Sequence, residues 1–162
     1  MIERHAVTAG RIRQELTNLE QVVERAERAV AAANQRPEEQ DLYLDSAALN
    51  LHDFYAGLER IFRIIAAGVD QSVPSGHDWH RELLRQMNTA LPQLRPQVIS
   101  EQTLKAIDQF LRFRHVVQNV YAFEFDPERI ERLVQGTRPA FEQARADLLT
   151  FADFLDSLAQ AE

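Results

Sequence analysis

The chain has 162 residues, of which 45% are hydrophobic and 27% are charged, so it is long enough for one packed domain and too apolar to be disordered. It contains no cysteine, which excludes disulfides and thiolate metal sites, and its net charge of −7 argues against general nucleic-acid binding. Only five residues are glycine, whereas good helix formers are abundant. We predict a single all-α domain over residues 1–162.

The beginning of the chain does not resemble a signal peptide. Charged residues alternate with isolated apolar residues over positions 1–13, and no stretch approaches the roughly 18 consecutive apolar residues of a membrane span. We therefore expect a cytoplasmic protein that is neither exported nor in contact with a membrane.

Two long amphipathic helices are predicted in the first half of the chain. Apolar residues recur at alternating steps of four and three from Ile12 to Ala33, and the pattern stops near residues 34–37. The same rhythm returns from Leu44 to Val69, with additional apolar residues that widen the stripe. The two helices are expected to pack as an antiparallel hairpin.

A loop and a short helix are predicted next. Turn-forming residues fill positions 68–76, after which Asp78 is placed to cap a short helix over residues 79–91. Pro92 ends that helix, and residues 93–100 form an irregular connector. The short helix is thus inserted between the second and third long helices.

Two more long helices complete the predicted fold. Ser100 can cap a helix whose apolar stripe begins at Leu104 and is interrupted by Arg114. The last helix starts at a capping Asp126 followed by Pro127, whose missing N–H costs nothing at the first helical position. The predicted architecture is an up-and-down bundle of four main helices plus one short inserted helix.

Polar residues gather at the end of the fourth predicted helix, beside apolar neighbours. Arg114, Gln118 and Tyr121 are spaced to lie on nearly the same helical face. His115 and Asn119 are four residues apart and form an adjacent row. Such placement on a packing helix requires an explanation.

The chemistry of this cluster suits phosphodiester cleavage. An arginine can stabilise the charged phosphate, and a histidine can move a proton near neutral pH. The alternative is that Arg114 and His115 simply form ion pairs with acidic residues at a helix interface. The residue types alone leave both interpretations open.

A family resemblance connects these residues. The segment Arg114-His-Val-Val-Gln-Asn-Val-Tyr121 resembles the Arg-polar-x-x-x-His-x-Tyr signature of HepT-like HEPN proteins. Residues 48–62 and 79–87 are also similar to segments of that family. Together with the order of the helices, the resemblance extends over most of the chain, from about Ala6 to Leu158.

The resemblance implies a homodimeric helical bundle that cleaves RNA without a metal or cofactor, through attack of a 2′-hydroxyl on the neighbouring phosphate. It places Arg114 as the phosphate-binding residue. It also implies a partner, a minimal nucleotidyltransferase, which neutralises the toxin by adding AMP groups to the motif tyrosine, here Tyr121. We expect Arg112 and Gln118 to contact the RNA.

The sequence departs from the family pattern at one position, because Asn119 stands where the catalytic histidine is expected. Asparagine does not exchange a proton near pH 7, and His115 is the histidine nearest in sequence. We therefore predict Arg114, His115 and Asn119 as catalytic residues. The alternatives are a subunit that binds a nucleotidyltransferase, a nucleotide or RNA without cleaving it, and a purely structural adaptor.

Other polar residues are predicted to have structural roles. His77 and His80 could face one metal ion, but a third ligand is missing nearby, so we expect no metal site. His80 is expected to seat the short helix, and Trp79 to anchor its packing. Glu59 is interpreted as a solvated or ion-paired residue rather than a catalytic carboxylate.

Overall fold

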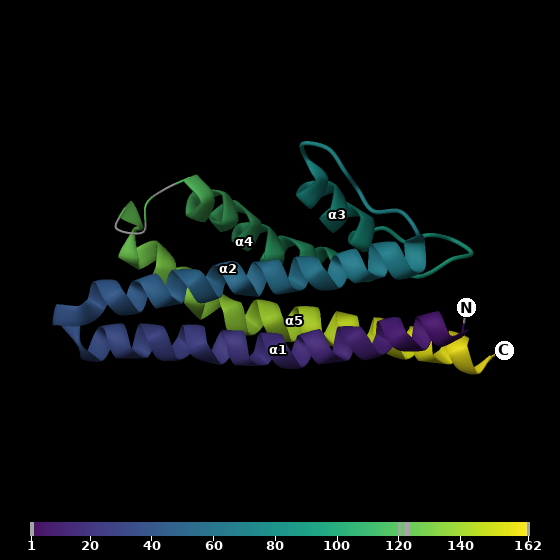
Figure 1. The fold of residues 1–162 in the computed structure, drawn as a ribbon, viewed down its shortest axis with the longest axis horizontal. Helices are drawn as coiled ribbons and strands as arrows, with labels where there is room; N and C mark the ends of the chain where they lie inside the picture. The colour runs from purple at the N-terminus through teal and green to yellow at the C-terminus, as the bar shows by residue number, and fades with distance from the viewer. Residues whose placement is uncertain (1, 120, 122–123, 162) are drawn as a thin grey trace.

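The fold is a helical bundle, as the sequence predicts, and the computed structural model describes residues 2–119, 121 and 124–161. Three long helices lie side by side, and a shorter pair covers one side of the second long helix (Figure 1). The α-helices of the described residues are α1 (Ile2–Gln35), α2 (Gln40–Ile65), α3 (Trp79–Asn88), α4 (Glu101–Asn119) and α5 (Pro127–Gln160).

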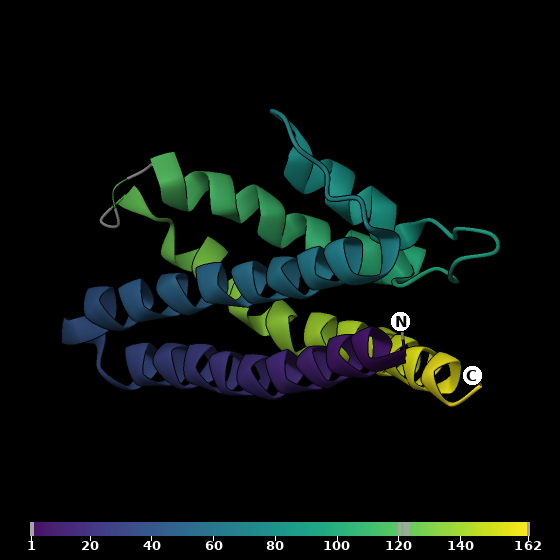
Figure 2. The ribbon, with the colours of Figure 1, turned by 45° about the vertical axis from the view of Figure 1, so that its right-hand side comes forward.

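The long helices alternate in direction. A single 3-10 turn, η1 (Pro37–Glu39), reverses the chain between α1 and α2, and α5 runs back alongside α1, so the described ends of the chain lie at one end of the bundle (Figures 1 and 2). Helix α4 runs against α2 and α5, and α3 diverges from it on the same side of α2 (Figure 2). The predicted up-and-down order with one short inserted helix is confirmed.

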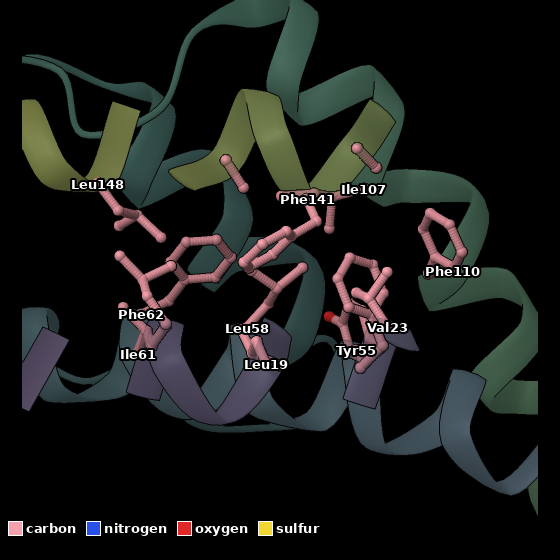
Figure 3. Packing of buried hydrophobic residues seen from close by; sticks show 14 of the residues in the cluster. Leu19, Val23, Tyr55, Leu58, Ile61, Phe62, Ile107, Phe110, Phe141 and Leu148 are labelled. Atoms are coloured by element: carbon pink, nitrogen blue, oxygen red, sulfur yellow. The ribbon is translucent and has the colours of Figure 1, made fainter. Parts of the chain in front are cut away.

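The core forms where the apolar stripes of the three long helices and of α4 meet. Figure 3 shows side chains of α1, α2, α4 and α5 interdigitating in one cluster. Burial of each large apolar side chain contributes roughly 1.5–3 kcal/mol, so this cluster is the main stabilising element. Helices α1 and α2 approach closely at Gly57, where an added Cβ would lie 2.5 Å from Leu19 Cδ2.

The chain stays helical beyond residue 68, where the predicted loop begins. After Ile65 the chain continues as one π-helical turn, η2 (Ala66–Asp70), which keeps Val69 buried. Gln71 then adopts a left-handed conformation, with φ of 56°, and terminates the turn. The apolar periodicity predicts the helical course to Val69 correctly, whereas the turn-forming residues place the start of the loop too early.

The short helix starts at Trp79, as predicted, but its cap and its last residue differ from the prediction. Asp78 precedes it but makes no side-chain capping hydrogen bond, and the helix ends at Asn88 rather than at residue 91. It ends early because the connector competes for its last turn: the N–H groups of Val98 and Ile99 both donate to the carbonyl oxygen of Met87, at 2.9 and 3.2 Å.

The other predicted caps are present. Ser100 Oγ accepts the Thr103 N–H at 3.1 Å at the start of α4, and Asp126 Oδ1 accepts the Glu128 N–H at 3.1 Å at the start of α5. Each such bond satisfies an N–H that the first helical turn leaves unpaired.

A buried arginine fixes the connector between α3 and α4. Arg95 donates through Nε and Nη2 to the carboxylate of Asp70, at 2.5 and 2.8 Å. Its remaining N–H groups donate to the carbonyl oxygens of Gln86, Thr89 and Pro96 at 2.9–3.0 Å. All five guanidinium donors are thus used, and the two charged side chains are 0% and 2% exposed.

None of the helices in the described part of the chain combines the length and the apolar character that crossing a lipid bilayer requires.

Candidate functional site

Arg114 lies on the face of α4 that packs toward the rest of the protein. Its neighbours Phe110, Leu111 and Phe113 are buried, and Arg114 itself is partly buried. A guanidinium in this position needs an acceptor. Arg114 Nη1 lies 2.9 Å from Nε2 of His80, the second residue of α3.

The other ring nitrogen of His80 contacts helix α2. Nδ1 of His80 lies 2.6 Å from Oε2 of Glu59. Because arginine has only donors, His80 Nε2 must accept the hydrogen from Arg114, and the imidazole proton therefore lies on Nδ1. We therefore assign His80 the Nδ1–H tautomer, which donates to the Glu59 carboxylate and presents the lone pair of Nε2 to Arg114.

Tyr55, one turn before Glu59 on α2, belongs to the same cluster. Burial raises the pKa of the Tyr55 hydroxyl well above its usual range. The negative charge of Glu59 and a hydrogen bond to it raise the pKa further, whereas Arg114 opposes the shift. The hydroxyl therefore stays protonated and helps to hold the carboxylate.

An aromatic ring restricts the position of the imidazole. The Trp79 and His80 ring centroids are 3.5 Å apart, with an interplanar angle of 35°. The guanidinium carbon of Arg63, on α2, lies 5.1 Å from the centroid of the Trp79 ring. The side chains of His80 and Glu59 are 17% and 10% exposed, so the cluster is enclosed but reachable from solvent.

Two hollows lined by arginine lie near this cluster. The larger, of about 910 Å³, is bordered by Arg4 and Arg11 of α1, by Arg60 and Arg63 of α2, and by Glu59 itself. The second, of about 380 Å³, lies between α3 and α4 and is lined by residues of both helices, namely Arg81, Leu84, Arg85, Leu104, Lys105, Asp108 and Arg112. Positive charge is therefore concentrated locally on a chain whose net charge is −7.

The predicted site residues occupy different environments. Arg112 is exposed beside the second hollow, paired with Asp108 at 3.0 Å. His115 is exposed on α4, next to Arg114. Tyr121 lies two residues after the end of α4 in the sequence and is 71% exposed. These positions are compatible with solvent-accessible roles for all three residues.

The backbones of Gln118 and Asn119 continue helix α4, and their side chains lie outside the described part of the structure. The role predicted for Asn119 beside Arg114 therefore stays a prediction. The same holds for the predicted contact of Gln118 with RNA.

Sequence reasoning interpreted Glu59 as a solvated or ion-paired residue, and it does pair with His80. The sequence did not indicate that His80 contacts Arg114. One signal could have indicated Glu59: it lies four residues after Tyr55 and three before Phe62, on the buried face of α2. A carboxylate on such a face needs a partner. No comparable pattern marks His80.

Comparison with known proteins gives one match. A family model described as "HepT-like protein" matches residues 46–155, from the first half of α2 almost to the end of α5. This range contains Glu59, His80 and Arg114. No curated protein and no solved structure matches the chain.

Proposed function

The chain belongs to the HepT-like protein family, and from this membership we propose that it is the toxin of a HEPN/nucleotidyltransferase toxin–antitoxin pair and cleaves RNA. The proposed reaction needs no metal: a 2′-hydroxyl attacks the neighbouring phosphate and displaces the 5′-oxygen of the next nucleotide. The protein must then supply a cation at the phosphate and a group that accepts a proton.

The contact between Arg114 and His80 is the observation that carries this proposal. The guanidinium is partly exposed and donates to an uncharged nitrogen at 2.9 Å. A phosphate brings a negative charge to the guanidinium and can accept two parallel hydrogen bonds from it, whereas the imidazole offers one uncharged acceptor. A phosphate that reaches Arg114 therefore competes well with the imidazole.

The residues predicted on α4 complete the proposal. His115 is one candidate for the proton acceptor, and Asn119 would orient a phosphate oxygen or hydroxyl by hydrogen bonding. Arg112 is proposed to bind the RNA backbone, which its exposed position beside Lys105 supports. Gln118 is proposed as a second RNA contact.

A homodimer is part of the proposal. Leu42 and Leu49, seven residues apart on α2, are both exposed, so one helical face carries uncovered apolar surface. We expect light scattering at micromolar concentration to give twice the chain mass. A monomer would contradict the dimer.

Tyr121 is proposed as the residue that the partner nucleotidyltransferase modifies with AMP. Its exposure of 71% is consistent with access by another enzyme. An added phosphate would repel RNA phosphates approaching Arg114. Intact-mass measurement after incubation with the transferase and ATP tests this, and a modified peptide without Tyr121 would refute the assignment.

A second candidate function is a HepT-like subunit that binds a nucleotidyltransferase, nucleotide or RNA without cleaving it. The observation that favours it is Asn119, which replaces the proton-carrying histidine of the family signature. The two candidates differ in one measurable property, the cleavage of RNA by the purified protein.

The deciding experiment is an RNA cleavage assay in EDTA with the unmodified protein, His115→Ala and Asn119→His. Cleavage by the unmodified protein supports the ribonuclease. If no RNA is cleaved but Asn119→His gains activity, the non-cleaving subunit is favoured, because the site then lacks only its proton carrier. Loss of cleavage in His115→Ala would assign the proton acceptor to that residue.

A further inference from the structure

We infer that His80, oriented by Glu59, accepts the proton of the attacking 2′-hydroxyl, and that Arg114 uncovers its Nε2 lone pair when RNA binds. This inference rests on the proposed ribonuclease function and names a proton acceptor outside the family signature. The three residues come from α2, α3 and α4, so the packing of three helices creates the site.

The geometry places the imidazole where the chemistry needs it. Nε2 of His80 is 2.9 Å from Arg114, the residue proposed to hold the phosphate. In the attack, the 2′-oxygen and the phosphorus belong to the same nucleotide, so a phosphate on Arg114 brings the 2′-hydroxyl close to Nε2. The tautomer is also correct, because the hydrogen on Nδ1 leaves the Nε2 lone pair as the base.

Arg114 masks this lone pair in the absence of RNA. A guanidinium has five N–H donors, and a phosphate oxygen is a stronger acceptor than a neutral ring nitrogen. When a phosphate binds, the Nη1–H group of Arg114 therefore stops donating to His80 Nε2 and donates to a phosphate oxygen instead. The exchange frees the base only when substrate is present.

The groups around His80 favour the proton transfer. From α2, the Glu59 carboxylate contacts Nδ1 at 2.6 Å and stabilises the imidazolium that forms, while the protonated Tyr55 hydroxyl supports that carboxylate. From α4, Arg114 opposes a second positive charge until the phosphate neutralises it. On α3, the Trp79 ring lies against the imidazole at a tilt of 35°, and Arg63 of α2 lies over Trp79.

The 2′-hydroxyl proton moves to Nε2 of His80 as the bond from the 2′-oxygen to phosphorus forms. The bond from phosphorus to the 5′-oxygen breaks, and the 5′-oxygen takes a proton from water. His80 then returns its proton to water, which restores the neutral imidazole.

The test compares His80→Gln and Glu59→Gln with the matched control His52→Gln in the full-length chain, with EDTA present. His52 is a partly exposed histidine of α2, paired with Asp53 at 3.7 Å, and should leave turnover unchanged. His80→Gln should lower kcat by about a hundredfold to ten-thousandfold, with little change in KM, because glutamine can accept the Arg114 hydrogen but cannot titrate.

Glu59→Gln tests the positioning role. It should lower kcat by about tenfold or more, because an amide can stabilise the wrong imidazole tautomer. It should also move the acidic limb of the pH–rate profile to lower pH, because loss of the negative charge favours the neutral imidazole. A merely structural role would reduce thermal stability and leave the limb in place, and that outcome overturns the inference.

Two further outcomes distinguish failure of the His80 role from failure of the ribonuclease function. If the unmodified protein cleaves RNA and His80→Gln cleaves equally well, the inference is overturned and the ribonuclease function stands. If the unmodified protein cleaves no RNA, the function itself fails, and the proton-acceptor role fails with it.

A second measurement covers the case in which the variants do not fold. In the unmodified protein, ¹⁵N NMR should show His80 with its hydrogen on Nδ1. Adding a 2′-O-methyl oligonucleotide, which cannot attack its phosphate, should shift the Nε2 resonance as Arg114 leaves it. A resonance that does not move while the oligonucleotide binds overturns the inference.

Discussion

Arg95 and Arg114 lie in neighbouring parts of the fold, but their guanidinium groups have different surroundings. Arg95, in the connector before α4, directs all five N–H donors to oxygen atoms of its own chain. Arg114, in the C-terminal third of α4, is partly exposed and donates to Nε2 of His80. The Arg95 side chain is 0% exposed and is paired with the buried carboxylate of Asp70.

The difference teaches which arginine can bind a ligand. A phosphate would not improve the hydrogen bonding of Arg95, because each of its donors already has an oxygen acceptor and a carboxylate already neutralises its charge. Arg114 gains from exchanging a neutral acceptor for a charged one. We therefore expect loss of Arg95 to affect stability and loss of Arg114 to affect activity.

The largest effect is expected for Arg95→Met. Removing the guanidinium leaves the buried Asp70 carboxylate without a counter-charge and with only the Gln86 Nε2 hydrogen bond, so the free energy of unfolding should fall by about 3–5 kcal/mol. Urea denaturation measures this change. The double variant Arg95→Met/Asp70→Leu is the control, because removing both charges should recover much of the loss. A decrease below about 1 kcal/mol in the single variant would contradict the structural role.

The next effect is expected for Arg114→Gln, and it should appear in catalysis. Losing a donor to the reacting phosphate typically lowers kcat by about a hundredfold to a thousandfold, or about 2.7–4 kcal/mol. The free energy of unfolding should change far less than in Arg95→Met. Steady-state kinetics and urea denaturation of the same preparation check both values. Equal loss of stability in the two variants would remove the distinction between these arginines.

The course of the helices could be predicted from the sequence because it depends on local patterns. Apolar periodicity identified the long helices, and Ser100 and Asp126 marked two helix starts correctly. The interruption of the α4 stripe at Arg114 was also visible in the sequence. Asp78 was misleading because a capping residue type does not guarantee the capping bond, as the geometry at α3 shows.

The contacts of Arg114 could not be predicted, because they depend on the packing of a short helix. His80 is 34 residues from Arg114 and 21 from Glu59 along the chain. The angle at which α3 meets α2 and α4 decides whether these side chains meet, and periodicity does not define that angle. The contact between Arg95 and Asp70 likewise joins residues that are 25 apart in the chain. It depends on the π-helical turn, which ends at Asp70.

A third prediction concerns Tyr55, whose hydroxyl hydrogen-bonds to Glu59 in the Arg114 cluster. Its pKa in the folded protein is raised above the ordinary value of 10.0. Below pH 10 both states keep the hydroxyl protonated, and its contribution to stability is constant. Above pH 10 the unfolded chain releases the proton while the folded protein retains it, so the free energy of unfolding should fall by about 1.4 kcal/mol per pH unit.

Urea denaturation between pH 9 and 11 measures this slope, with Tyr55→Phe as the control that lacks the ionising group. The variant should lose the alkaline component that the unmodified protein shows. Parallel curves for the two proteins would mean that Tyr55 ionises equally in both states, which contradicts its buried position beside Glu59.

The smallest effect is expected for a third arginine, Arg138, on the surface between α5 and α1. It contacts Glu20 at 2.8 Å and Glu27 at 2.7 Å, and these hydrogen bonds raise the pKa of its guanidinium. Exposed ion pairs typically contribute only about 0.2–1 kcal/mol, because water and salt screen them. Arg138→Gln should therefore destabilise the protein within that range at low salt, and by less in 1 M salt, where the screening length is about 3 Å.

The matched control for Arg138 is Arg145→Gln, which removes a more exposed guanidinium on the same helix, 3.8 Å from Glu142. It should change stability less than Arg138→Gln. A loss from Arg138→Gln that approaches the Arg95→Met value, or that persists in 1 M salt, would show that screening does not limit this contact. The order Arg95, Arg114, Arg138 then ceases to follow burial and acceptor type, and the physical basis for assigning Arg114 to ligand binding is lost.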